Sequence, residues 1–274
     1  MLTKEKLTAE KSLDKFFQPK SIAIIGASQN PAKVGNAIVR NLLASGYSGK
    51  IYPVNPKEEQ ILDLKCYPSL EKIPGSTAGD KGKAELAVIA IPAPGVLKAV
   101  QDCAKNGIRF IVVITAGFKE TGLQGAELEK ELVSFCLEHQ IQLVGPNCLG
   151  LTHTHTPLNI SFGRGYPLQG NVTFISQSGA ILTAILGWSE VAGIGFSHFV
   201  SLGNKAVLQE TDFLSYAATD PSTKVILCYL EDITDGQRFL EVATRVSVDK
   251  PLVVLKAGSS PAGAKAASSH TGAL

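Results

Sequence analysis

Short runs of β-branched and apolar residues alternate with longer helical stretches along most of this 274-residue chain. Several runs are nearly continuous Val, Ile and Leu, which is typical of parallel strands covered on both faces. This alternation predicts an α/β fold with doubly wound parallel sheets. We expect strands at residues 21–25, 50–54, 86–91, 110–115, 142–144, 171–175, 196–200, 224–230 and 251–255, and helices at 36–45, 95–106, 125–139, 180–192, 210–219 and 236–247.

The alternation is interrupted between Gly145 and Gly170, where Gly, Pro and Asn mark turns. A second strand–turn–helix unit begins at Asn171. We therefore expect a domain boundary near Gly150, with an N-terminal extension at 1–16, a first domain at 17–148 and a second at 149–274.

Composition excludes several classes of protein. The net charge is +2, which argues against a broad nucleic-acid surface. The charged N-terminus does not read as a signal peptide, and no apolar run reaches the ~20 residues of a membrane span. The five cysteines are scattered and none forms Cys-x-x-Cys, so we expect packing cysteines, no metal site and a reduced, cytoplasmic protein.

A phosphate-binding turn is indicated after the first strand. Gly26-Ala27-Ser28 follows the strand, and a helix begins near Gly35. A glycine allows a tight turn here, and the amides at the helix N-terminus then point at an anion. The spacing is not Gly-x-Gly-x-x-Gly, so an ordinary βαβ turn without a ligand stays an alternative.

The end of the second strand distinguishes between nucleotide ligands. An NAD site would place an acid there to bind the ribose hydroxyls. This strand runs into Asn55-Pro56-Lys57, with no acid until Glu58. A basic residue at this position favours a ribose that carries a phosphate, as in coenzyme A or NADP.

A second anion site is indicated by Ser176-Gln177-Ser178-Gly179, between a strand and a helix. Two hydroxyls and several helix N-terminal amides suit a phosphate or phosphoryl group. A nucleophile elbow requires Gly-x-Ser-x-Gly, which fits poorly. Helix capping by Ser176 or Ser178 is the simpler interpretation.

A carboxylate and a histidine complete the set of candidates. Glu231 follows the strand at 224–230, at the edge where ligands bind to parallel sheets. His270 lies in a Ser- and Gly-rich loop, where a neutral imidazole is a plausible nucleophile toward phosphorus. Glu231 could hold one ring nitrogen of His270. Taken alone, however, Glu231 is interpreted as a solvated loop acid. Lys256, at the end of the next strand, has the same two interpretations. His153 and His155 lack further metal ligands, so we expect structural or surface roles.

Together these motifs resemble the NDP-forming acyl-CoA synthetases, such as acetate–CoA ligase (ADP-forming), and the related α subunit of succinyl-CoA synthetase. The resemblance covers about residues 16–274. Each motif is short, but seven in order are specific. They are the stretch from Phe17 to Ser28, Tyr52-Pro53-Val54-Asn55-Pro56-Lys57, Ile114-Thr115-Ala116-Gly117-Phe118, Gly145-Pro146-Asn147-Cys148, Ser176-Gln177-Ser178-Gly179, Gly203-Asn204-Lys205 and Ser269-His270-Thr271-Gly272.

The resemblance implies a Rossmann-like CoA-binding domain followed by a flavodoxin-like domain that is truncated at its C-terminal end, both with parallel sheets. It makes His270 a phosphohistidine with Glu231 beside it, and it makes Ser176, Ser178 and Gly179 the helix N-terminus that receives the phosphoryl group. It places CoA against Gly26, Ser28, Lys33, Val34, Lys57, Pro92, Thr115, Ala116, Gly117 and Asn147.

The implied reaction converts acyl-CoA, phosphate and ADP into a carboxylic acid, CoA and ATP. No ATP-grasp sequence is recognisable, so ADP, ATP and Mg²⁺ are expected only in a missing part or a β-type partner subunit, in an oligomer. The chain is thus expected to be a piece of a longer protein. Two alternatives are the CoA-binding regulatory region of a fused protein lysine acetyltransferase, and an NAD(P)-binding dehydrogenase or sensor.

Overall fold

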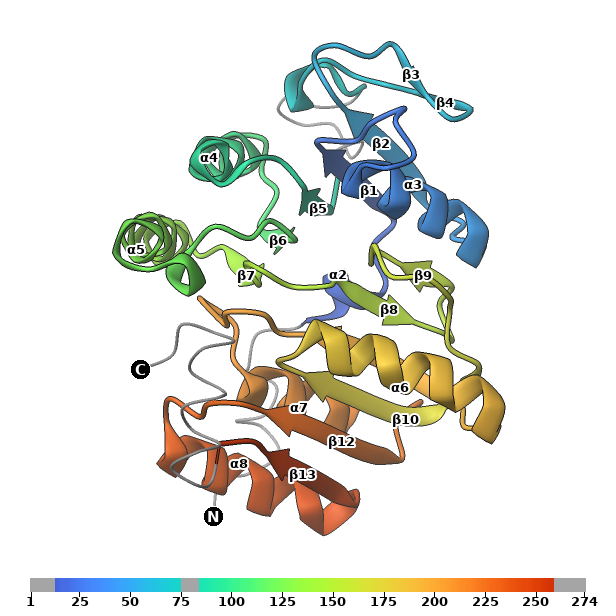
Figure 1. The fold of residues 1–274 in the computed structure, drawn as a ribbon, viewed down its shortest axis with the longest axis vertical. Helices are drawn as coiled ribbons and strands as arrows, with labels where there is room; N and C mark the ends of the chain where they lie inside the picture. Colours follow the sequence, from blue (N-terminus) through green and yellow to red (C-terminus); the bar gives the residue numbers. More distant parts are fainter. Residues whose placement is uncertain (1–12, 75–83, 259–274) are drawn as a thin grey trace.

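The structure, a computed structural model, describes residues 13–74 and 84–258. They form two large β-sheets with helices on both faces, one sheet above the other in Figure 1. A small hairpin of β3 (Gln60–Ile61) and β4 (Leu64–Lys65) projects beside the first sheet. This arrangement confirms the α/β fold class that the alternating pattern predicts.

The first sheet is wholly parallel and has the strand order β2-β1-β5-β6-β7. Its strands are β1 (Ser21–Ile25), β2 (Lys50–Val54), β5 (Leu86–Ile89), β6 (Phe110–Val113) and β7 (Gln142–Val144). The chain adds β2 on one side of β1 and the later strands on the other. The strand order therefore reverses between β1 and β5, where a ligand crevice forms at the carboxyl ends.

Helices cover both faces of this sheet, which explains why its strands are so apolar. Figure 1 shows α3 (Val34–Ser45) on one side and α4 (Val96–Lys105) and α5 (Leu123–Glu138) on the other. Ile38 and Leu42 of α3 pack in one core cluster, whereas Val100 of α4 and Leu132 of α5 pack in another. Short 3-10 turns lie at η1 (Leu70–Lys72), η2 (Ala93–Gly95) and η3 (Lys119–Thr121).

The second sheet has the strand order β13-β12-β10-β11-β8-β9 and is mixed. Strands β10 (Gln169–Ser176), β11 (Phe196–Ser201), β12 (Val225–Leu230) and β13 (Leu252–Lys256) are parallel. Strands β8 (Leu151–His153) and β9 (Leu158–Asn159) join antiparallel. The expectation that both sheets are parallel is therefore wrong for this one, because a short hairpin can add antiparallel strands without a crossover helix.

The strand order of the second sheet also reverses, in this case between β10 and β12. Helix α6 (Gly179–Ala192) follows β10 and packs on β10 and β11, whereas α7 (Glu210–Thr219) and α8 (Gly236–Asp249) lie on the opposite face. The loops after β10 and β12 thus meet at one edge of the sheet, where a ligand can bind.

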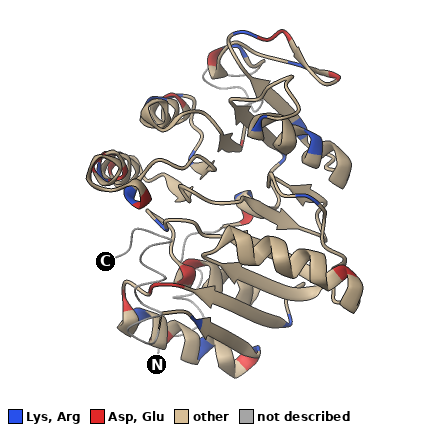
Figure 2. Ribbon diagram, viewed as in Figure 1, with Lys and Arg blue, Asp and Glu red and all other residues tan. Residues whose placement is uncertain are grey.

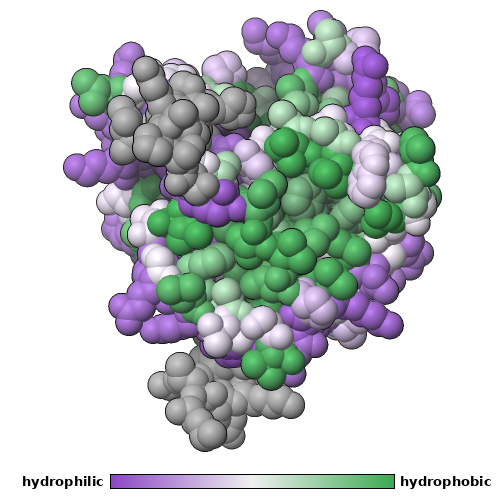
Figure 3. Space-filling view, turned by 60° about the horizontal axis from the view of Figure 1, so that its bottom comes forward, coloured by the Kyte–Doolittle hydropathy of each residue, from purple (hydrophilic) through white to green (hydrophobic). Residues whose placement is uncertain are grey.

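One face of the second domain carries many exposed hydrophobic residues. Figure 3 shows hydrophobic residues gathered over a broad area of the surface. Trp188 and Val191 of α6 are exposed, as are Val253 and Leu255 of β13. By contrast, Lys, Arg, Asp and Glu are scattered over both domains (Figure 2), which agrees with the near-zero net charge.

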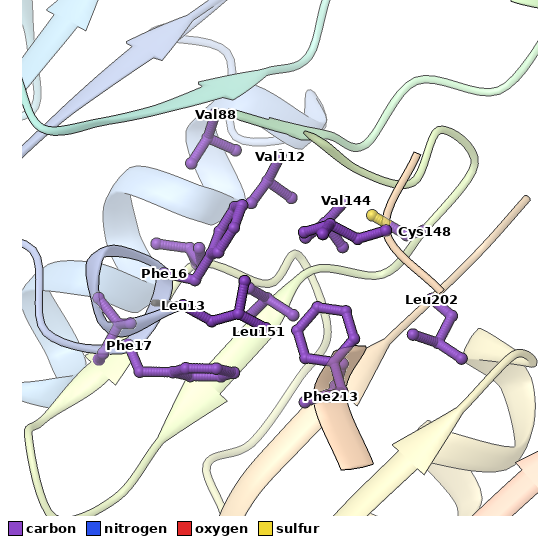
Figure 4. Close-up of a cluster of buried hydrophobic side chains, with 14 of the residues drawn as sticks. Leu13, Phe16, Phe17, Val88, Val112, Val144, Cys148, Leu151, Leu202 and Phe213 are labelled. Atoms are coloured by element: carbon purple, nitrogen blue, oxygen red, sulfur yellow. The ribbon is translucent and has the colours of Figure 1, made fainter. Parts of the chain in front are cut away.

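The short helix α2 (Asp14–Phe17) links the two sheets. Its Phe16 ring contacts Phe110 of β6 edge-on at 5.3 Å, and its Phe17 ring stacks on Tyr216 of α7 at 4.8 Å. Figure 4 shows both phenylalanines in the cluster between the sheets, with Leu13 beside them. Leu13 and Phe16 are therefore buried in the core, although they fall within the predicted N-terminal extension. These side chains are buried by residues of the two sheets that are distant in the sequence, so the local pattern cannot predict their burial.

Most element boundaries agree with the sequence pattern to within two residues. The sequence did not predict the β3–β4 hairpin, β8 or β9, because each run is too short for a periodic pattern. Within the described residues, no helix combines the length and hydrophobicity that a bilayer crossing requires.

Candidate functional site

A cavity of about 590 Å³ lies between the carboxyl edge of the first sheet and the N-terminus of α6. We call it the interdomain cavity. Six of the predicted binding residues line it, from both halves of the chain: Val34, Thr115, Ala116, Asn147, Ser178 and Gly179. The structure thus brings the CoA-type and phosphoryl-type motifs together at one place.

A second cavity of about 550 Å³ adjoins the interdomain cavity, and we call it the β2-side cavity. Gly26, Asn55 and Pro56 line it, and Ile91 lines both cavities. The two spaces therefore meet where β1 and β5 end, at the reversal of the strand order. A long ligand could extend from one into the other.

Close packing of two glycines shapes the turn between the cavities. The Gly26 N–H donates to the Val54 carbonyl at 3.0 Å, and its φ of +90° suits glycine. Gly35 lies in the first turn of α3, where an added Cβ would come within 2.0 Å of the Gly26 carbonyl oxygen. The two glycines thus let the helix N-terminus approach the strand end, which is the role of closely packed glycines in dinucleotide sites, although their spacing differs.

Asn55 holds the end of β2 against this turn. Its side-chain amide donates to the Ala27 carbonyl at 2.8 Å, and its Oδ1 accepts from the Lys57 N–H at 2.9 Å. The position of an NAD-binding acid is thus occupied by an amide that stabilises the turn. Lys57 itself is exposed just beyond the β2-side cavity.

The loop between β10 and α6 shows separate roles for its two serines. Ser178 caps α6 by accepting from the Ile181 N–H at 3.4 Å, which confirms the capping interpretation. The Ser176 side chain is fully buried, and its hydroxyl donates to the Ser178 carbonyl at 2.8 Å. Ser178 and Gly179 line the interdomain cavity, whereas Ser176 shapes the loop from inside.

Gln177 connects this loop to the end of β12. Its Oε1 accepts from the Glu231 N–H at 2.9 Å and from the Asp232 N–H at 3.1 Å, and its Nε2 donates to the Asp232 carboxylate. Gln177 also lines the interdomain cavity. Glu231 exposes only 8% of its surface, so the interpretation of it as a solvated loop acid is wrong. It is buried because it directly follows β12, an interior strand that pairs with β10 on one side and β13 on the other.

Lys205 is a buried cation at the same edge. Its ammonium lies 2.9 Å from Glu210 and 3.0 Å from the Asp232 carboxylate, and its side chain is only 1% exposed. Burial alone would raise the pKa of Asp232, but the charge and hydrogen bond of Lys205 lower it below its usual value. This ion pairing keeps the loops after β11 and β12 together.

Asn204, next to Lys205, points the other way, into the first domain. Its side-chain amide donates to Glu120 at 2.6 Å and to Glu129 at 2.8 Å, and its Oδ1 accepts from the Asn147 amide at 3.3 Å. The sequence marks Gly203-Asn204-Lys205 only as a family motif. The role of Asn204 could not be read from it, because Glu120 and Glu129 are 84 and 75 residues away.

The other predicted CoA-binding residues surround the cavities without lining them. Ser28 accepts from the Asn30 N–H at 3.1 Å, and Lys33 is the exposed residue before α3. Pro92 precedes η2, and Gly117 has a φ of +108° beside Ala93. Lys256 donates to the Glu231 carbonyl at 2.8 Å, a structural contact.

His270 lies outside the described residues. The structure describes the four remaining histidines, and it places His153 and His198 in a buried stack with ring centroids 4.1 Å apart. His155 is exposed. Of the two histidines in the sequence motif, His153 is therefore structural and His155 lies on the surface, as expected. Residues 13–74 and 84–258 contain no group of three His, Cys, Asp or Glu side chains placed to hold a metal ion. All five cysteines are free and buried, and burial raises the pKa of the Cys148 thiol to about 12.

The fold is that of an α/β protein with two adjoining cavities at the carboxyl ends of its first sheet, one of which the second half of the chain completes with the N-terminus of α6. Residues 20–154 match the family described as CoA binding domain, and residues 169–274 match the succinyl-CoA ligase like flavodoxin domain.

Comparisons over nearly the whole of this chain agree with these family matches. The chain is 50% identical over 262 residues to acetate–CoA ligase [ADP-forming] I of Archaeoglobus fulgidus, covering 96% of this chain and 37% of that protein. It is 43% identical to the α subunit of acetate–CoA ligase [ADP-forming] I of Pyrococcus furiosus, covering 96% of this chain and 56% of the subunit. A solved dinucleotide-forming acetyl-coenzyme A synthetase 1 of Ca. Korarchaeum cryptofilum, in complex with phosphate and ADP, superposes with a TM-score of 0.88 at 46% identity, over 96% of this chain and 55% of that one.

Nearly the whole chain is thus homologous to part of the ADP-forming acetate–CoA ligases, in agreement with the resemblance that the motifs indicate. It spans between 37% and 56% of the length of these relatives. The relatives named here are all CoA ligases or synthetases, so they lend no support to the acetyltransferase or the dehydrogenase alternative.

Proposed function

We propose that this chain is the CoA-binding and phosphohistidine-bearing part of an ADP-forming acyl-CoA synthetase. Phosphate attacks the acyl carbon of acyl-CoA, the C–S bond breaks, and acyl phosphate and CoA form. The His270 imidazole then attacks phosphorus, the P–O bond to the carboxylate breaks, and the carboxylic acid leaves. The phosphoryl group finally passes from His270 to ADP.

The interdomain cavity carries this proposal. It joins the strand ends of the first domain, through Thr115 and Asn147, to the N-terminus of α6 at Ser178 and Gly179. Acyl transfer from CoA and phosphoryl transfer must occur next to each other, because acyl phosphate is the product of one and the substrate of the other. The amides at the start of a 14-residue helix favour the anionic phosphoryl group.

The two cavities suggest an orientation for CoA. We place its nucleotide half in the β2-side cavity, with the ribose phosphate near Lys57, and its thiol end across Ile91 in the interdomain cavity. Asn55 supports CoA over NAD, because its amide oxygen and nitrogen both bind the backbone of the turn rather than standing free for ribose hydroxyls.

Other parts of the cycle follow from the same proposal. Glu231 would hold one ring nitrogen of His270 and leave the other free to attack. The nucleotide and Mg²⁺ would bind in an ATP-grasp domain or a β-type subunit of an oligomeric cytoplasmic enzyme. The division of this chain into domains at 17–148 and 149–274 belongs to the proposal as well.

Ligand binding tests the first half of the proposal. Isothermal titration of the 274-residue chain is expected to show binding of CoA and much weaker binding of NADH. Tighter binding of NADH than of CoA would reject the ligand assignment, whatever the outcome for His270.

Phosphoryl transfer tests the second half. Acetyl phosphate labelled with ³²P is expected to label the protein, and the label should be stable to base and labile to acid, as a phosphohistidine is. His270→Asn should abolish labelling, while His139→Asn, an exposed histidine at the end of α5, should leave it unchanged. Equal labelling of wild type and His270→Asn would exclude His270 as the acceptor.

A further inference from the structure

One wall of the interdomain cavity, Thr115 and Ala116, is held by a partly buried polar cluster, in which Asn204 also lines the cavity whereas Glu120 lies behind the wall. Glu120 of η3 accepts from the Gly117 N–H at 2.6 Å and from the Phe118 N–H at 3.1 Å, with the same carboxylate oxygen. Its other oxygen accepts from the Asn204 amide of the second domain. The backbone just after the wall is therefore fixed by a side chain that itself depends on Asn204.

Each hydrogen-bond donor and acceptor of Asn204 has a partner. One N–H points to Glu120 and the other to Glu129 of α5, while Oδ1 accepts from Asn147, a further cavity residue. Its backbone N–H donates to the Pro146 carbonyl at 2.9 Å, and its carbonyl accepts from the Lys119 ammonium at 2.7 Å. An amide with two donors is the one neutral group that can bridge two carboxylates in this geometry.

The two carboxylates, Glu120 and Glu129, require the hydrogen bonds that Asn204 donates to both of them. Burial would raise the pKa of Glu120, but the hydrogen bonds from Asn204, Gly117 and Phe118 lower it below its usual value. Glu120 is half-buried, whereas Glu129 is buried, and the Lys119 ammonium lies 3.7 Å from Glu129. Without the donors of Asn204, two carboxylates would face each other in a region of low polarity.

We propose that Asn204 and Glu120 are positioning residues that connect the second domain to the CoA-binding wall of the first. Asn204 orients Glu120, and Glu120 fixes the Gly117 and Phe118 amides and thus the Thr115–Ala116 wall. The inference rests on the proposed function, because it assigns the thiol half of CoA to this wall.

The test compares whole CoA with its nucleotide half, 3′-phospho-ADP, which has no atoms to reach the interdomain cavity. Asn204→Asp keeps the shape of the side chain and replaces the two N–H donors by a third carboxylate. We expect it to weaken CoA binding by about tenfold or more in isothermal titration and to change the binding of 3′-phospho-ADP by less than about twofold, because charge-assisted hydrogen bonds are lost only at the wall. Thermal melting first checks that the variant is folded.

Glu120→Gln provides an independent variant, because Glu120 does not line the cavity and can act only through the backbone that it holds. The same selective loss of CoA is expected. Glu127→Gln, an exposed acid on α5, is the matched control and should bind both ligands as wild type does.

The outcomes separate this inference from the proposed function. Normal CoA affinity in both folded variants would overturn it, and so would an equal loss of CoA and 3′-phospho-ADP, which would indicate a general structural role. If the wild-type chain bound neither ligand, the proposed function would fail first.

Discussion

Lys57 is the residue that we propose to distinguish CoA from dephospho-CoA. It is exposed, and it follows the turn that Asn55 fixes beside the β2-side cavity. If it binds the ribose phosphate, Lys57→Ala should weaken CoA by about 1–3 kcal/mol, as expected for a charge-assisted hydrogen bond. Titration with dephospho-CoA, which lacks that phosphate, should show little change. Equal losses for the two ligands would assign Lys57 another role.

The buried pair of His153 and His198 makes the folded state sensitive to acid. Burial, followed by the neighbouring His153, lowers the pKa of His198 to about 3, against the opposing charge of Asp220. Burial likewise lowers the pKa of His153. The Nε2 atoms of both rings lack a hydrogen-bond partner among the described residues, so protonation there would bury an N–H donor without an acceptor. His155, Asp220 and Lys250 are the other titratable groups that act on the pair.

The sign of the pH dependence follows from the lowered pKa. Below pH 6.5 the unfolded chain binds protons that the folded chain does not, so stability is complete above this value and falls as the pH drops toward 3. From pH 7 to pH 5, His198 alone should cost about 2 kcal/mol of the free energy of unfolding. Urea unfolding at both pH values should show this loss in wild type and a smaller one, by about that amount, in His198→Asn. An unchanged difference would mean that folding does not lower the pKa of His198.

Gly35 and Gly187 both lie in helices, but only Gly35 is packed closely against another element. Gly35→Ala places a methyl group 2.0 Å from the Gly26 carbonyl oxygen, so α3 must move away from the end of β1. We expect a loss of about 2–3 kcal/mol in the free energy of unfolding, because backbone cannot yield as a flexible side chain can. The adjoining cavities should change with it, so CoA binding should also weaken.

Gly187→Ala in α6 is the control for that substitution. An added Cβ there meets nothing within 4 Å, and the residue lies inside a helix. Alanine should therefore stabilise the protein by about 0.5–1 kcal/mol through helix propensity alone. Denaturant unfolding of the two variants should give shifts of opposite sign, and a loss of stability in both would show that the effect at position 35 is not steric.

One hydrophobic core extends continuously from the first sheet to the second. One hydrophobic cluster includes Ile22 of β1, Leu151 of β8 and Phe213 of α7, with Phe16 and Phe17 of α2 among them. Both sheets therefore contribute to the same buried apolar surface, and we expect them to unfold together.

Phe17→Ala tests this shared core. Phe17 is fully buried against His198 and Tyr216, so its truncation should cost about 3–5 kcal/mol. Urea unfolding followed by the single Trp188 of α6 and by far-ultraviolet circular dichroism should still show one midpoint, shifted equally for both signals. Two separate midpoints in the variant would show that the sheets are independent units.

Much of the architecture was readable from the sequence, because helices and buried parallel strands have local periodic patterns. The runs that became β1, β5, β10 and β12 belong to this class, as do the glycine turn after β1 and the serine turn after β10. These turns follow strands that flank the reversals of strand order, so the position of the candidate site was also predictable. The domain division and the role of His270 stay predictions.

Tertiary structure was needed for everything that depends on contacts between distant segments. The short antiparallel strands β8 and β9, the buried position of Glu231, and the place of Phe16 in the core could not be derived from local patterns. Asn204 is the clearest case, since its two acceptors come from another domain. Hydrophobic periodicity acts between neighbours in the chain, whereas burial and hydrogen bonding act between neighbours in space, and only the folded chain brings those together.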